Sequence, residues 1–299
     1  MSLLESVPNF SAAQDARTVS RLHEALASSA RVLDVHSDLD HNRSVFTLAG
    51  SGRELVGALE RAVRVAIESI DLGVHRGVHP RIGAADVMPI VPLKAGDEHR
   101  AHEAAHKLAS RVGQLDVPVF FYGRLAARGQ RPADFRRGGI EGLSARLAAG
   151  ELTPDIGPRR LHPTAGGVLI GVRDPLIAFN VFLRSDDVEV AKTIAARVRE
   201  SAGGLPGIRA LGLALPTAGR VQVSMNIEDW RATPPHRAVE AVAAEAHAQG
   251  VEVDRSELVG LIPAGAAAAA AQGPLGLPSL APTKLLEPQL LDVLSDWRS

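Results

Sequence analysis

The sequence has no cysteine among its 299 residues, which excludes disulfide bonds and thiolate chemistry. Aromatic residues make up only 3%, and the formal net charge is −1, so we expect neither stacking platforms for unpaired bases nor a general attraction to phosphate. No apolar run approaches the roughly 20 residues of a membrane-spanning helix, and the N-terminus lacks the pattern of a secretory signal. These absences favour a cytoplasmic protein without a nucleic-acid or membrane partner.

What is present indicates two folded lobes. A chain of 299 residues is near the size at which one core divides into two, and 45% hydrophobic with 22% charged residues is typical of globular proteins. Extended and helical patterns alternate along both halves, which favours an α+β fold of two α/β sandwich lobes, with mostly antiparallel sheets and helices on one face. We assign residues 1–150 to the first lobe, 151–167 to an interlobe loop and 168–299 to the second lobe.

The apolar spacing predicts the individual elements. Expected helices lie at 11–27, 54–72, 97–112, 143–148, 187–201, 235–249, 266–271 and 288–297. Expected strands lie at 3–7, 31–35, 44–49, 87–91, 117–122, 168–172, 176–183, 208–215, 220–227 and 251–258. Residues 124–137 and 155–167 contain too many glycines and prolines, or too many charges, to predict a regular element.

Chemically reactive side chains concentrate between the helix at 54–72 and the strand at 87–91. The stretch His75–Val87 (HRGVHPRIGAADV) contains two histidines, two arginines and two glycines. Connections of this kind display functional groups on a rigid scaffold. Pro80 biases His79 toward an extended conformation. A second cluster occupies the loop His36–Arg43, and a third the loop Asp155–Gly167.

His79 has two interpretations from its residue type alone: an acid–base group with a pKa near neutrality, or a side chain that caps a turn. A metal site formed by His75 and His79 with His36 or His41 is a third interpretation. Gly77 and Pro80 argue against the helix that this spacing requires, and no metal is expected. The three histidines of the helix at 97–112 stand among charged residues, so they are expected on a solvated face: His99, His102 and His106.

The remaining polar residues of these loops stay ambiguous at this level. Arg43 and Arg81 suit bidentate binding of carboxylates, but a single arginine is equally often a surface charge. Asp38, Asp40 and Asn42 either bind a ligand or form a turn. No phosphate-binding glycine motif is present, so no nucleotide cofactor is expected.

Several collinear motifs resemble the glutamate formimidoyltransferase (formiminotransferase) family. The principal ones are Ser6–Ser11 (SVPNFS), Asp40–Val45 (DHNRSV) and His75–Gly83 (HRGVHPRIG). Further matches are Leu161–Gly166 (LHPTAG), Ile177–Val181 (IAFNV) and Leu258–Pro263 (LVGLIP). Together the motifs extend over nearly the whole chain.

The resemblance implies two α/β lobes with a ligand groove between them, usually in a homodimer. It implies an enzyme of one-carbon metabolism and histidine degradation, which moves the formimidoyl group from N-formimidoyl-L-glutamate to N5 of tetrahydrofolate, the co-substrate. His79 matches the family's catalytic histidine, so the resemblance implies that it serves as the general base and acid. Candidate substrate-binding residues are Arg43, Asn42, Arg81, His41 and Asp40. The matched folate-binding segment comprises Gly157, Pro158, Arg159, Arg160, Leu161, His162, Pro163, Thr164, Ala165 and Gly166. The rest of the chain is not expected to hold a cyclodeaminase domain.

Two positions depart from the family pattern. Val78 stands where an acidic residue usually precedes the catalytic histidine, and Ser11-Ala12-Ala13 replaces the usual Ser-Glu-Gly. The loss of two carboxylates beside a site for a cationic amidine leaves two alternatives open. One is a folate-binding protein without transfer activity, and the other is a related one-carbon transferase with a different donor.

Overall fold

In the computed structural model, which describes residues 3–272, the chain divides after Pro175 into two units. Strand β7 (Val168–Val172), expected to open the second lobe, pairs with strands of the first unit. Residues 151–167 also belong there, since Ile156 bridges Val119 and Gly166 bridges Gly83. The structural division therefore lies after β7, whereas the sequence predicted a boundary at 167/168.

A mixed sheet forms the centre of the first unit. Its other strands are β1 (Leu4–Ser6), β2 (Asn9–Phe10), β3 (Arg31–Asp38), β4 (Arg43–Gly50), β5 (Ala85–Pro92) and β6 (Val119–Gly123). β1 and β2 each pair antiparallel with both β4 and β5, and β3 pairs antiparallel with β4. β7 lies between β5 and β6 and runs parallel to both. This arrangement brings the end of β3 and the start of β4 near the loop that precedes β5.

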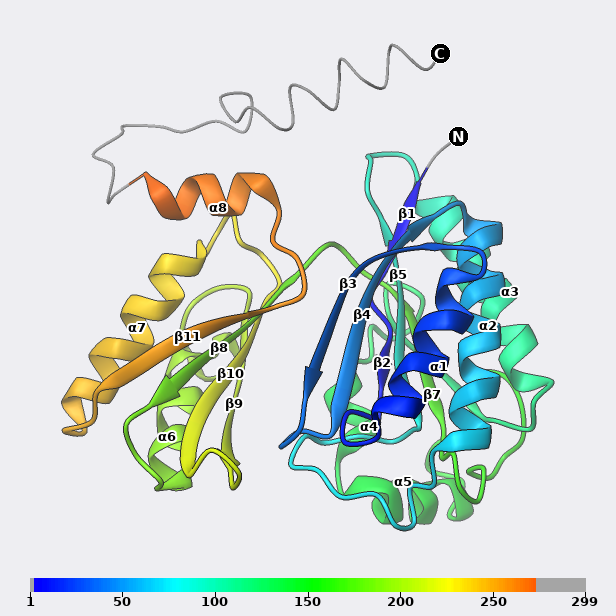
Figure 1. Ribbon diagram of the computed structural model, residues 1–299, viewed down its shortest axis with the longest axis horizontal. Coiled ribbons are helices and arrows are strands. Elements are labelled where there is room, and N and C mark those ends of the chain that lie inside the picture. Colours follow the sequence, from blue (N-terminus) through cyan, green and yellow to red (C-terminus); the bar gives the residue numbers. More distant parts are fainter. Residues whose placement is uncertain (1–2, 273–299) are drawn as a thin grey trace. The chain divides into compact units, whose positions relative to one another are not determined.

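Helices α1 (Ala16–Ala27), α2 (Gly52–Ser69) and α3 (Glu98–Gly113) pack on one face of this sheet (Figure 1). α2 begins with a capping box, because Ser51 and Glu54 satisfy each other's backbone N–H groups. The short helices α4 (Pro132–Arg136) and α5 (Gly139–Ala148) contact the opposite face. Successive side chains of a strand point to opposite faces of the sheet. Val119 of β6 therefore packs in the core on the side of α1, α2 and α3, whereas Phe120 packs on the other side with α4 and α5.

The second unit is an antiparallel sheet with helices against it. Its elements are β8 (Ile177–Leu183), α6 (Val188–Val198), the 3-10 helix η1 (Glu200–Ala202), β9 (Ile208–Leu215), β10 (Arg220–Ile227), α7 (Pro235–Ala248), β11 (Val253–Val259) and α8 (Ala264–Ala271). The strand order is β11-β8-β10-β9. Val181 and Val223 of the sheet share a core with Ile194 of α6 and Val242 of α7.

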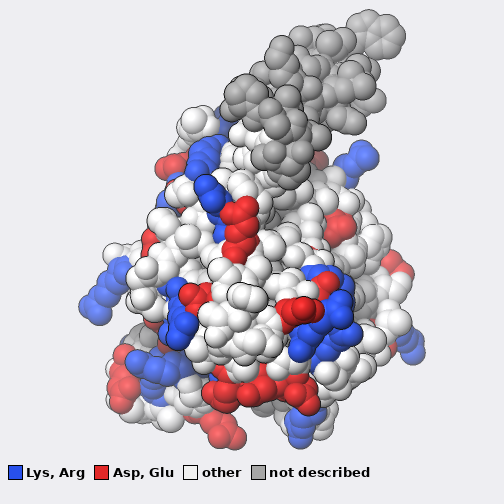
Figure 2. Space-filling model, turned by 90° about the vertical axis from the view of Figure 1, so that its left-hand side faces the viewer, with Lys and Arg blue, Asp and Glu red and all other residues white. Residues whose placement is uncertain are grey.

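The α+β class and the two-lobe organisation are thus confirmed. β3 runs on to Asp38, beyond its predicted end, and α4 lies in a stretch for which no element was predicted. The helix expected at 288–297 lies outside the described residues. Within residues 3–272, no helix is both long enough and apolar enough to cross a bilayer. Basic and acidic side chains are interspersed on the surface shown in Figure 2.

Candidate active site

The irregular connection between α2 and β5 packs against the turn that joins β3 to β4. The Val78 N–H donates to the carbonyl oxygen of Asp40 at 3.1 Å, and the Asn42 side-chain amide donates to the carbonyl oxygen of Arg76 at 2.9 Å. The first two clusters recognised in the sequence therefore form one site, which lies within the first unit.

Asn42 connects three segments of this site. Its backbone adopts a φ of 44°, a left-handed conformation in which asparagine is among the favoured residues. Its side-chain oxygen accepts hydrogen bonds from the backbone N–H groups of Ala13 and Gln14, at 2.9 and 3.1 Å. Asn42 is buried, and its amide is engaged by backbone groups, so it positions the site.

Two glycines allow close backbone approach. A β-carbon on Gly77 would lie 2.4 Å from the carbonyl oxygen of His41, and one on Gly83 would lie 1.9 Å from that of Gly167. Neither position accommodates a side chain without backbone movement. The glycines of the motif are therefore explained by packing, at the two places where this connection contacts its neighbours.

His79 lies half-buried at the centre of the site. Nη1 of Arg43 lies 2.8 Å from its Nε2. Because a guanidinium only donates, Nε2 accepts this hydrogen bond, and the imidazole is neutral with its proton on Nδ1. Burial holds the pKa of His79 well below its ordinary value, and the nearby cations Arg43, Arg136 and Arg81 act in the same direction.

Two more histidines are kept neutral beside it. The rings of His41 and His79 lie 5.6 Å apart between centroids. Burial lowers the pKa of His41 to about 4, although Asp38 opposes the shift. Burial, reinforced by Arg81, lowers that of His75 to about 4. Nη1 of Arg81 lies 2.6 Å from Nδ1 and 2.7 Å from Nε2 of His75. Because the carbonyl oxygen of Asn42, 3.2 Å from Nε2, can only accept, Nε2 of the neutral ring carries the proton and Nδ1 accepts from Arg81.

The two predicted carboxylate-binding arginines are used differently. Arg81 donates through Nη2 to the carbonyl oxygens of His41 and His79, at 2.8 and 2.9 Å, and so fixes the loop itself. Arg43 donates a hydrogen bond to His79, and its guanidinium has further N–H donors. Burial lowers the pKa of each arginine to about 10, so both remain cations at neutral pH.

Asp86 and Arg136 also belong to this site, although the sequence did not single them out. Oδ1 of the buried Asp86 accepts from the backbone N–H groups of Ile82 and Gly83, at 2.7 and 3.2 Å. Its Oδ2 accepts from Nη2 of Arg136 in α4 at 2.5 Å. A signal for Asp86 existed, because it is an acid at the start of an apolar strand. Arg136 was one charge in a basic, irregular stretch.

The predicted folate-binding segment lies along the same connection. The carbonyl oxygen of Thr164 accepts from the Leu72 N–H at 2.8 Å, and that of Ala165 accepts from the Ala84 N–H at 2.9 Å. At the other end of the segment, Arg159 and Arg160 are exposed, and Arg160 pairs with Asp116 at 2.5 Å. The structure thus places the Leu161–Gly166 motif against the His79 loop.

The described residues 3–272 contain no group of three or more histidine, aspartate or glutamate side chains that could hold a metal ion. The strongest candidate ligand, Nε2 of His79, faces the Arg43 cation. Cations and neutral imidazoles of this kind suit an anionic substrate and a proton transfer.

Comparison with known proteins identifies relatives over both units. The family model for the formiminotransferase domain, N-terminal subdomain, matches residues 3–173, and the model for the formiminotransferase domain matches residues 178–273. A glutamate formimidoyltransferase of Thermoplasma acidophilum is 41% identical over 270 residues, which cover 88% of this chain and 89% of that protein. One of Streptococcus pyogenes is 39% identical over 267 residues, with the same coverage. The formimidoyltransferase-cyclodeaminase of Sus scrofa is 35% identical over 87% of this chain, which corresponds to 50% of that protein.

Proposed function

Because this chain belongs to the formiminotransferase family, we propose that it is an enzyme that transfers the formimidoyl group from N-formimidoyl-L-glutamate to N5 of tetrahydrofolate. The observation that best supports a working site is the neutral His79 with its Nε2 lone pair directed at Arg43. A transferase of this kind needs a base at the attacking nitrogen and a cation for the carboxylates of the donor.

In the proposed reaction, N5 of the folate attacks the amidine carbon of the donor, and a bond between them forms. His79 accepts the proton that N5 loses and passes it to the glutamate nitrogen as the bond from that nitrogen to the amidine carbon breaks. Glutamate and 5-formimidoyltetrahydrofolate are the products. Atoms and charge balance without an oxidant or a metal ion.

Arg43 links substrate binding to this proton transfer. Its guanidinium occupies Nε2 of His79 and opposes protonation of the ring. A donor carboxylate that pairs with Arg43 draws the guanidinium away and compensates its charge. Nε2 then becomes available, and the pKa of His79 rises toward the range useful for a base.

Residues 157–166 supply the folate-contacting surface in this proposal, with Arg159 and Arg160 near the carboxylates of the folate tail. The support for this segment is the set of backbone contacts that residues 164–167 make with the connection that carries His79. A homodimeric assembly and a cytoplasmic location are further parts of the proposal.

The test is an assay of the purified protein with N-formimidoyl-L-glutamate and tetrahydrofolate, with the product identified by mass. We expect 5-formimidoyltetrahydrofolate from the wild-type protein and a loss of about 10²–10⁴-fold in kcat for His79→Ala at unchanged circular dichroism. Folate binding without product from this donor would overturn the proposal. Val78, in place of the usual acid, makes a panel of formimino and formyl donors informative, because turnover of another donor alone would identify a related transferase.

A further inference from the structure

Arg136 and Asp86 form an ion pair that the reaction proposed above does not use. Their side chains are 17% and 3% exposed, respectively, and their contact distance is 2.5 Å. A pair this shielded from water is costly to break, because the remaining partner is left as an uncompensated buried charge. The pair is therefore a fixed part of the site.

Asp86 also holds the backbone of the loop that carries His79. Its second carboxylate oxygen accepts from the N–H groups of Ile82 and Gly83, which follow His79 after two residues. We propose that Arg136 is a positioning residue for His79: its guanidinium holds Asp86, and Asp86 holds the backbone that carries the imidazole. This proposal rests on the proposed function in taking His79 as the reacting base.

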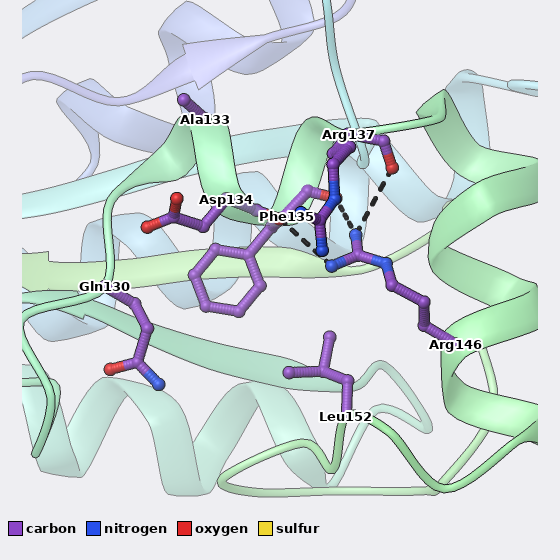
Figure 3. Close-up of a pocket in the computed structure, with 7 residues that line it drawn as sticks. All are labelled: Gln130, Ala133, Asp134, Phe135, Arg137, Arg146 and Leu152. Atoms are coloured by element: carbon purple, nitrogen blue, oxygen red, sulfur yellow. Dashed lines mark hydrogen bonds between the residues drawn. The ribbon is translucent and has the colours of Figure 1, made fainter. Parts of the chain in front are cut away.

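Three contacts hold α4 so that Arg136 reaches Asp86. Phe135 is buried and packs on Phe120 of β6, with ring centroids 5.3 Å apart. Nη1 and Nη2 of Arg146 in α5 donate to the carbonyl oxygens of Asp134 and Phe135, at 3.0 and 2.7 Å. Figure 3 shows Arg146 reaching these backbone groups. The pocket beside them has a volume of about 180 Å³. A helix of five residues is thereby fixed from two sides.

The neighbouring Arg137 provides a matched control. It follows Arg136 directly, but it is exposed and lines the pocket beside α4 (Figure 3), and the ion pair with Asp86 is made by Arg136. A glutamine at either position removes one positive charge from the protein. Only the change at 136 removes the partner of Asp86.

The charge of Arg136 also acts on His79. The groups that oppose protonation of His79 are the cations Arg43, Arg136 and Arg81, together with His41. The carboxylates that face these arginines are Asp38 and Asp86. Loss of Arg136 removes one cation and leaves the Asp86 charge uncompensated, so both consequences raise the pKa of His79.

The experiment is an NMR titration of the His79 imidazole in the full-length protein, without substrate, for wild type, Arg136→Gln, Arg136→Lys and Arg137→Gln. We expect a higher midpoint in Arg136→Gln, and a midpoint near the wild-type value in Arg136→Lys, which keeps the charge, and in Arg137→Gln. Asp86→Asn keeps the oxygen acceptor but removes the negative charge, so its midpoint is expected at or below that of wild type. Because unfolding would move every variant toward the ordinary histidine value, opposite effects at 136 and 86 exclude a general loss of structure.

In the transferase assay, Arg136→Gln is expected to lower kcat/KM up to about 100-fold, as a displaced catalytic group does, and to shift the acidic limb of its pH profile upward. A His79 midpoint in Arg136→Gln equal to that in Arg137→Gln would overturn the proposal. The titration needs no turnover, so it distinguishes failure of this inference from failure of the proposed reaction.

Discussion

Arg43 donates to Nε2 of His79 across 2.8 Å, from the first residue of β4 to the loop that precedes β5. The contact joins a cation to a neutral base, and it determines which ring nitrogen carries the proton. It also explains how a site with several arginines keeps a histidine unprotonated at neutral pH. Substrate anions are therefore expected to alter the basicity of His79 as they bind.

Arg43→Met is expected to impair donor binding and to raise the pKa of His79. The lost charge-assisted hydrogen bonds predict an increase in KM for the donor of about 10- to 100-fold. Because Arg43 lowers the pKa of His79, its removal moves the acidic limb of kcat/KM to higher pH. The pH–rate profile measures this shift. Arg53→Met, an exposed change in α2, is the control, and an acidic limb shared by both variants would contradict the assigned role of Arg43.

Gly77→Ala is expected to destabilise the protein, because the new β-carbon would lie 2.4 Å from the carbonyl oxygen of His41. Forced repacking of this kind costs about 1–3 kcal/mol in the free energy of unfolding, measurable by urea denaturation. Gly57→Ala is the control, and the opposite effect on stability is expected from it. Its β-carbon would meet neighbours at an ordinary 3.5 Å inside α2, so about 0.5–1 kcal/mol of stabilisation is expected. Equal effects at the two positions would exclude the steric explanation.

The free energy of unfolding is expected to decrease as the pH falls from 6.5 toward 4. His41 and His75 have a pKa of about 4 in the folded protein, against an ordinary 6.5, so the unfolded chain binds protons that the folded chain does not. Stability is therefore lost below 6.5, by up to about 1.4 kcal/mol per pH unit for each histidine.

Urea midpoints at several pH values check this dependence. His75→Gln is expected to reduce the slope, whereas His99→Gln, an exposed change in α3, is expected to leave it as in wild type. A slope that is insensitive to His75→Gln would show that other groups cause the acid sensitivity.

The sequence predicted most of the elements, though not β2 or α4, and it predicted the loop His75–Val87, because these features depend on local patterns. The apolar spacing predicts α2, and an apolar run predicts β5. The histidines and arginines between them mark the loop, and each of these signals comes from residues that are close in the sequence. His79 and Arg43 were both named as candidate site residues, the first by its motif and the second by its residue type. Their direct contact was not predicted, since it depends on the pairing of β2 with both β4 and β5.

What the sequence missed depends on contacts between distant segments. β7 joins the first unit by parallel pairing with β5 and β6. Its continuous apolar run is typical of a buried strand, but it does not show which strands it pairs with. α4 is too short to show helical periodicity, and contacts with Phe120 and Arg146 stabilise it. Arg136 could therefore not be distinguished from the other charges around it.

Variants of Arg160 and of its partner Asp116 can show whether Arg160 binds folate or only stabilises the loop. It is 61% exposed and pairs with Asp116, which is 56% exposed, so the pair contributes about 0–1 kcal/mol to stability. Arg160→Ala and Asp116→Asn both remove the charge pair, and asparagine tolerates the positive φ of 62° at position 116. If Arg160 binds the folate tail, Arg160→Ala weakens tetrahydrofolate binding several-fold in calorimetry. Asp116→Asn frees the guanidinium and leaves affinity equal or higher. Equal losses in both variants would mean that the pair only orders the loop, and the folate tail would have to bind elsewhere.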